Sequence, residues 1–223
     1  MDTGEQKNPS LQRKMERRAT RGFLLVARAV SFVFTPFYLP LVGTAALFLF
    51  SYIRYFMRWQ YMALVFLIVW AFTIALPQLS IRYYRKILGW TRAEMGRKER
   101  RMIPYIFSIV SYFMCWHLMN LLGLPRFLSS IILVSLAIQV LFAIVNIWWK
   151  ISTHSGAIGG VGGTLMAFSL LFHFNPIWWL CLIILLAGIV GSSRMMLRQH
   201  TLSQVVCGFL LGWVCAFFVI VQF

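Results

Sequence analysis

The sequence predicts an all-α fold, a polytopic membrane helix bundle with about seven transmembrane helices. Of the 223 residues, 61% are hydrophobic and only 12% are charged, against roughly 25% charged residues in a soluble domain. Several apolar runs reach the about 20 residues that a helix needs to cross a bilayer. None alternates apolar and polar residues as a strand of a membrane barrel would. The chain is therefore expected to be an integral membrane protein.

Two parts are expected along the chain: a basic polar tail over residues 1–22 and one membrane-embedded domain over residues 23–223. The tail lacks the short apolar core and cleavage site of a secretory signal, so we expect it to be retained. Residues 22–30 are expected to lie along the interface as an amphipathic lead-in. Helices are then predicted over 31–53, 61–81, 103–122, 127–148, 156–172, 177–191 and 201–223.

Prolines and glycines support these boundaries. Pro36 and Pro40 predict a kink or a re-entrant start in the first span, and Pro77 falls near the end of the second. Gly123 with Pro125, and Asn175 with Pro176, predict the turns after the third and fifth spans. Five glycines begin the fifth span, where they favour close approach of a neighbouring helix and can expose backbone N–H groups to an anion. They are Gly156, Gly159, Gly160, Gly162 and Gly163.

Seven crossings place the connections after the second, fourth and sixth spans on the side of the N-terminus. All of the 21 Lys and Arg residues except Arg54, Arg58 and Arg126 then fall on that side. The positive-inside rule predicts that this side, with the N-terminus, is cytoplasmic. The net charge of +16 is explained by contact with anionic headgroups or phosphorylated lipids, without nucleic acid as a partner.

Residues 191–212 place polar groups between two apolar runs. Burying Arg194, Arg198 and His200 at membrane depth costs several kcal/mol on the order of the transfer scales, so these residues mark a site lined by water or filled by a ligand. Lys150, Ser152 and His154 belong to the connection after the fourth span and are expected on the same side. His117 and His173 are expected at the opposite side, as structural or interfacial residues.

The acidic residues limit the chemistry of this site. The chain has five Asp and Glu residues, and none follows position 99. The sequence therefore disfavours a magnesium site built from an aspartate cluster. The four cysteines lie inside predicted spans without CxxC spacing, so they indicate neither disulfides nor a zinc site. We expect no metal and no cofactor.

Phosphate chemistry fits the remaining groups. Arginine and lysine side chains hold phosphate oxygens, and a serine hydroxyl adds a donor. One histidine can attack phosphorus while another protonates the leaving oxygen. His200 and Gln204 are four residues apart, so the glutamine carbonyl can fix the tautomer of the imidazole if the last helix begins close to Thr201.

The segment Ser193-Arg194, five residues, His200, three residues, Gln204 resembles the third signature of the type 2 phosphatidic acid phosphatase superfamily, SRxxxxxHxxxD. Every fixed position matches except the last. Ile151-Ser152-Thr153-His154 is similar to the second signature, PSGH. The first signature, KxxxxxxRP, is absent in its usual form; the basic run from Arg97 to Arg101 before Pro104 is a candidate remnant, and Lys150 is a second candidate for its lysine.

The resemblance implies a phosphatase-type helical core and metal-independent removal of phosphate from a lipid phosphate or isoprenoid diphosphate through a phosphohistidine. It implies His200 as nucleophile and His154 as general acid, with Gln204 in place of the aspartate that orients the nucleophile. Arg194, Ser152, Ser193, Lys150, Arg97 and Arg101 are implied as phosphate-holding residues. The resemblance further implies a place in a bacterial inner membrane.

Two other classes of protein fit the same residues. A phosphatase-like protein that binds a lipid phosphate without hydrolysing it is favoured by Gln204, because an amide keeps the geometry of an aspartate but not its charge. A transporter or channel with a basic cavity is disfavoured, because the polar motifs occur once and are not duplicated.

Overall fold

A computed structural model describes residues 22–50, 57–89 and 102–222. These residues form helices joined by short connections, and six of the helices are long and apolar enough to cross a membrane. The all-α membrane bundle predicted from the sequence is thereby confirmed. The predicted tail lies outside the described residues except for Gly22.

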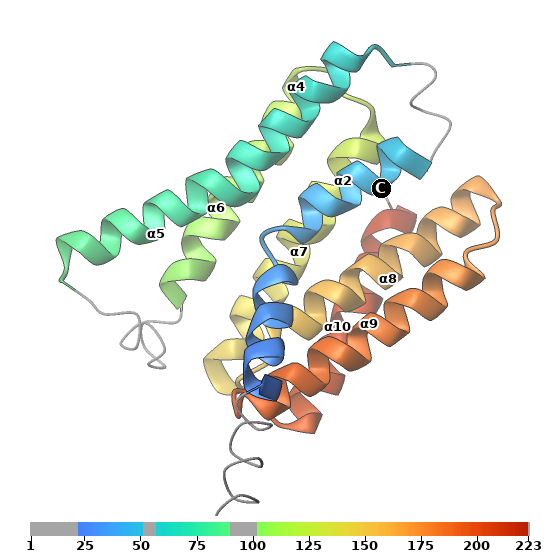
Figure 1. The fold of residues 1–223 in the computed structure, drawn as a ribbon. Coiled ribbons are helices and arrows are strands. Elements are labelled where there is room, and N and C mark those ends of the chain that lie inside the picture. Colours follow the sequence, from blue (N-terminus) through green and yellow to red (C-terminus); the bar gives the residue numbers. More distant parts are fainter. Residues whose placement is uncertain (1–21, 51–56, 90–101, 223) are drawn as a thin grey trace, which may run out of the picture.

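The described helices follow one another up and down the bundle (Figure 1). Their bounds are Gly22–Val33, here named the leading helix, α2 Leu39–Phe50, α4 Trp59–Trp70, η1 Ala71–Ala75, α5 Leu76–Ile87, α6 Met102–Leu121, α7 Arg126–Trp148, α8 Thr153–Phe172, α9 Ile177–Met196 and α10 Leu202–Gln222.

The region predicted as a first continuous span is two helices with a turn between them. The leading helix ends at Val33, and α2 begins at Leu39, so the break surrounds Pro36 as the sequence predicts. The two helices follow each other from one end of the bundle to the other (Figure 1). Together they take the place of the predicted first span.

The second predicted span is longer than expected. α4, η1 and α5 form one continuous helical segment, Trp59–Ile87, with a π turn in its middle. The Ser111 hydroxyl of α6 donates a hydrogen bond to the Phe72 carbonyl in that π turn. Because the helix continues past residue 81, Arg82, Arg85 and Lys86 lie on the last turns of α5.

Apolar side chains from α2, α4, α6 and α7 form the largest core. Its fully buried members include Val65, Met119 and Ile132. Smaller clusters join α7 to α8 and α10 through Val134, and α8 to α9 through Ile158. α7 therefore lies between the two parts of the bundle seen in Figure 1: it packs on α4 and α6 in the largest core and on α8 and α10 through Val134.

The closest packing is between α8 and α10, and glycines make it possible. A Cβ atom built on Gly212 would lie 2.0 Å from the Gly156 carbonyl oxygen, and one on Gly159 would lie 2.0 Å from the Phe209 carbonyl oxygen. The two backbones are in direct contact, which is the packing role predicted for the glycines of the fifth span. The starts of α8 and α10 are fixed side by side as a result.

The substitution Gly212→Ala should destabilise the protein strongly, because the new methyl group meets backbone atoms that no rotamer change can move. We expect the free energy of unfolding to fall by about 3 kcal/mol or more. Thermal denaturation of the detergent-solubilised protein measures the change. Gly188→Ala in α9 is the matched control, since a Cβ there has nothing within 4 Å. Equal stability of the two variants would contradict the packing argument.

Candidate active site

The α7–α8 and α9–α10 connections are joined at one end of the bundle. Lys150 Nζ donates a hydrogen bond to the Gln199 carbonyl over 2.7 Å, and the Ser152 N–H donates to the Gln204 carbonyl over 3.3 Å. Both bonds cross between segments about fifty residues apart in the chain. The structure thus brings together the two polar connections that the seven-span topology placed on one side.

The end of α9 determines where His200 lies. α9 runs five residues beyond the predicted end at Gly191, so Ser193 and Arg194 belong to its last turns. The Arg198 N–H then donates to the Met195 carbonyl and the Gln199 N–H to the Arg194 carbonyl. This is a Schellman motif, with Arg198 at φ 52° in the left-handed position that glycine usually occupies. The reversal brings His200 directly before α10.

His200 and Gln204 form a hydrogen-bonded pair at the start of α10. His200 Nδ1 lies 3.2 Å from Gln204 Oε1, and the Thr201 N–H donates to the same oxygen over 3.2 Å. Because the backbone N–H can only donate, the amide atom that it meets is the oxygen, and His200 Nδ1 carries the proton. The lone pair of the imidazole is therefore on Nε2.

His154 and Arg194 meet at a third residue, Ser31 of the leading helix. His154 Nε2 lies 3.1 Å from the Ser31 carbonyl oxygen, and Arg194 Nη1 donates to the Ser31 hydroxyl over 2.6 Å. A carbonyl only accepts, so His154 carries its proton on Nε2, and Nδ1 is the ring atom that gains or loses a proton. His154 lies within electrostatic range of both Arg194 and His200.

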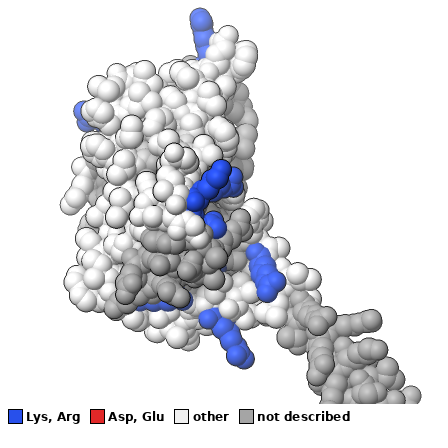
Figure 2. Space-filling model, turned by 90° about the vertical axis from the view of Figure 1, so that its left-hand side faces the viewer, with Lys and Arg blue, Asp and Glu red and all other residues white. Residues whose placement is uncertain are grey.

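Two nitrogen atoms of this group are buried and have no hydrogen-bond partner among the described residues: His154 Nδ1 and Arg194 Nε. The five acidic residues of the chain all fall in ranges outside the description, so the described part has no carboxylate to pair with Arg194. The face in Figure 2 likewise shows Lys and Arg but no Asp or Glu. Buried polar atoms are seldom left unpaired, and an anion would satisfy Arg194 Nε, and His154 Nδ1 when that atom is protonated.

The predicted phosphate-holding serines have structural partners. Ser152 is the N-cap of α8: it is fully buried, and its hydroxyl accepts from the Ser155 N–H over 3.4 Å. The Ser193 hydroxyl donates to the Ile189 carbonyl one turn earlier, over 2.8 Å. Each oxygen keeps further hydrogen-bonding capacity. Their contact with phosphate stays a prediction.

Arg97 and Arg101, predicted from the basic run before Pro104, lie outside the described residues. Within the described ranges, no group of three or more His, Cys, Asp or Glu side chains gathers that could hold a metal ion.

Ser31 was not predicted as a site residue. The only signal for it in the sequence is a hydroxyl at the junction of the lead-in and the first predicted span.

Comparison with known proteins found a match in one case. No curated protein and no solved structure matches the chain. A family model described as PAP2 superfamily matches residues 146–223, a range that contains α8, α9 and α10. His154, Arg194, His200 and Gln204 all lie within it. The match agrees with the resemblance drawn from the two motifs: residues 146–223 are similar to the PAP2 superfamily.

Proposed function

We propose that this protein is a membrane phosphatase that hydrolyses a lipid phosphate or isoprenoid diphosphate through a phosphohistidine, without a metal. The PAP2 superfamily match supports a phosphatase-type function in general. The observation that carries the finer proposal is the arrangement of two histidines with defined tautomers beside Arg194, in a described region that has no carboxylate.

In the proposed first step, the lone pair of His200 Nε2 attacks phosphorus. His154 enters this step as the imidazolium, with a proton on each ring nitrogen. The bond between the attacked phosphorus and the leaving oxygen breaks, and that oxygen, the lipid oxygen of a monophosphate or the bridging oxygen of a diphosphate, takes the proton from His154 Nδ1. Arg194 binds the phosphate oxygens and stabilises the charge that they carry in the transition state. The products of this step are a lipid with one phosphate fewer and a phosphohistidine at position 200.

In the second step, a water molecule attacks the phosphohistidine. Its proton passes to His154 Nδ1, the bond between phosphorus and His200 Nε2 breaks, and inorganic phosphate leaves. His154 is then protonated again and ready for the next substrate. Gln204 holds the Nδ1 proton of His200 throughout, so the imidazole keeps Nε2 directed at phosphorus.

A lipid as substrate agrees with the position of the group at the end of a membrane bundle. The apolar tail of a lipid can lie beside the lipid-facing side chains of the bundle while its phosphate reaches Arg194.

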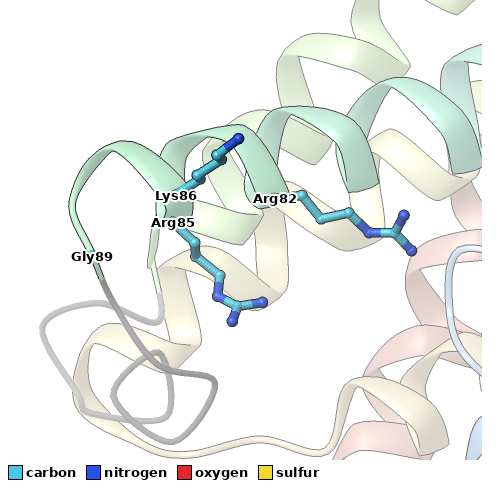
Figure 3. A pocket seen from close by; sticks show the side chains of 4 residues that line it. All are labelled: Arg82, Arg85, Lys86 and Gly89. Atoms are coloured by element: carbon cyan, nitrogen blue, oxygen red, sulfur yellow. The ribbon is translucent and has the colours of Figure 1, made fainter.

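A second basic feature is a shallow pocket at the end of α5, lined by Arg82, Arg85, Lys86 and Gly89. Arg82 and Arg85 extend to one side of that helix and Lys86 to another (Figure 3). These cations suit anionic headgroups of membrane lipids.

A second function is favoured by one observation, the neutral side chain at position 204. A protein with this site could bind a lipid phosphate and release it unchanged, because Gln204 orients His200 without stabilising a positive charge on it. Phosphate release from a panel of diacyl phosphates, isoprenoid diphosphates and phosphorylated lipid carriers, measured in detergent, separates the two functions. Release by the wild type that His200→Ala lacks supports hydrolysis; equal release by both excludes it.

We further propose that the site faces the cytoplasm of a bacterial cell, with the membrane spans in the inner membrane. The α7–α8 and α9–α10 connections, which contain Lys150 and Arg198, lie toward the end of the bundle where the leading helix begins, whereas α10 ends at the opposite end (Figure 1). A reporter fused after residue 223 should therefore lie outside the cytoplasm. A reporter enzyme that works only outside the cytoplasm should then be active, and one that works only in the cytoplasm should be inactive. A cytoplasmic signal would contradict this orientation or the number of crossings.

A further inference from the structure

The leading helix contributes Ser31 to the site from a distant part of the chain. Ser31 is 8% exposed, and it contacts His154 and Arg194, which follow it by 123 and 163 residues. The leading helix lies outside residues 146–223, so the superfamily match does not cover it. Its contacts with the site are a property of this chain.

The carbonyl of Ser31 is available because the leading helix ends there. The Phe34 N–H donates to the Val30 carbonyl, and the Thr35 N–H donates to the Phe32 carbonyl. The next residue is Pro36, which has no N–H. The Ser31 carbonyl is thus one of the unpaired acceptors at a helix end, and it accepts from His154 Nε2 at 3.1 Å and from the Thr35 hydroxyl at 3.4 Å.

The end of a helix also carries a partial negative charge, because the peptide dipoles are aligned. In the described part of the chain no carboxylate stands near His154 or Arg194. The C-terminal end of the leading helix therefore supplies the negative potential that holds these two groups in place. The partial charge of the helix end neutralises Arg194 much less than a carboxylate would. Most of the positive charge of Arg194 therefore remains to attract an anion.

The hydroxyl of Ser31 fixes the guanidinium. It accepts from Arg194 Nη1 over 2.6 Å, which restrains the movement of the group. Arg194 Nε, buried without a partner among the described residues, is then presented in a fixed direction. A guanidinium binds phosphate through donors in a rigid fork, so its orientation decides whether two contacts form or one.

From these contacts we infer that Ser31 is a positioning residue of the phosphate site, an inference that rests on the proposed function. Its hydroxyl orients Arg194 toward the phosphate oxygens, and its carbonyl keeps the proton of His154 on Nε2, so that Nδ1 exchanges the proton with the substrate. The leading helix is part of the site, and Ser31 acts through the two residues that touch phosphate.

The test uses three variants of the full chain in detergent. Ser31→Ala removes the hydroxyl and keeps the carbonyl, and Ser31→Thr restores a hydroxyl. Ser169→Ala is the matched control, because Ser169 is also 8% exposed and its hydroxyl donates within its own helix, to the Met166 carbonyl. For each protein, KM and kcat are measured on a lipid phosphate, and the affinity for inorganic phosphate is measured from the rise in Tm with phosphate concentration.

For Ser31→Ala we expect KM and the phosphate dissociation constant to rise about tenfold, the size of one hydrogen bond to a charged group. kcat should change less than KM, because the carbonyl that holds His154 is intact. Ser31→Thr and Ser169→Ala should stay within about twofold of the wild type. A purely structural role would lower Tm without phosphate and leave the phosphate affinity unchanged.

The outcomes separate this inference from the proposed function. If the wild type hydrolyses lipid phosphate and Ser31→Ala matches it in KM and phosphate affinity, the inference is wrong and the function stands. If the wild type binds phosphate without hydrolysis, the proposed function fails and the binding measurement alone decides the role of Ser31. If the wild type binds no phosphate, Ser31 has nothing to position and both are wrong.

Discussion

His200→Ala should lower the rate of phosphate release from the preferred lipid by at least about a thousandfold, the loss that removal of a nucleophile causes in enzymes with histidine and serine triads. Nε2 is the ring atom with the lone pair, because Nδ1 carries the proton and donates it in a hydrogen bond to the Gln204 oxygen. Alanine leaves no group in its place that can form a bond to phosphorus. Release of inorganic phosphate under single-turnover conditions measures the loss of the chemical step.

His117→Ala is the control for this loss, since His117 is an exposed histidine of α6 that stacks on Phe113. It should keep the activity of the wild type. Trapping the phosphohistidine intermediate is a second measurement. The wild type should carry covalently bound phosphate that is labile in acid and stable in base, and His200→Ala should carry none. A His200→Ala protein that still turns over at the rate of the wild type would rule out the proposed nucleophile.

A carboxylate at position 204 should raise the rate of phosphate release by one to three orders of magnitude, if hydrolysis occurs. Bond formation at Nε2 places a positive charge on the imidazole of His200, and a negative side chain bonded to Nδ1 stabilises that charge. Gln204→Glu is the sharpest change, because glutamate has the length of glutamine and differs in charge. Gln204→Asp tests the residue of the superfamily motif, with a shorter side chain. kcat is compared at saturating substrate.

Gln204→Met is the matched neutral variant, with similar length and no amide. It should lower kcat, because the tautomer of His200 is then no longer fixed. The Thr201 N–H also loses its acceptor, so the start of α10 should be less stable by about 1 kcal/mol. If Gln204→Glu and Gln204→Met change kcat equally, the charge at this position has no part in the reaction.

Much of the fold could be predicted from the sequence, because lipid imposes simple rules. Apolar runs of sufficient length are expected to be helices, and Pro36 with Pro40 predicted a kink or a re-entrant start in the first of them. The glycines of the fifth span predicted a close helix contact, which the structure provides on α10. The spacing of Ser193, Arg194, His200 and Gln204 predicted the superfamily region, because those residues are near one another in the chain.

Other features depend on tertiary contacts that local sequence does not contain. The helix now labelled α9 was predicted to end at Gly191, where the polar segment begins. Gly191 instead lies against Val205, where a Cβ would come within 2.7 Å of the valine side chain, and the left-handed position is taken by Arg198. Ser31 could not be identified as a site residue, because its partners follow it by more than a hundred residues.

The contact between the α8 and α10 backbones has a consequence for the selectivity of the proposed phosphatase. His154 is the second residue of α8 and His200 lies two residues before α10, so the main chains that carry the two imidazoles are held together by backbone atoms that cannot yield. If the two histidines act on a phosphate as proposed, they have little freedom to follow one of a different size or depth. Selectivity among lipids would then come from how each headgroup fits between them, while the acyl or isoprenoid chain adjusts around it.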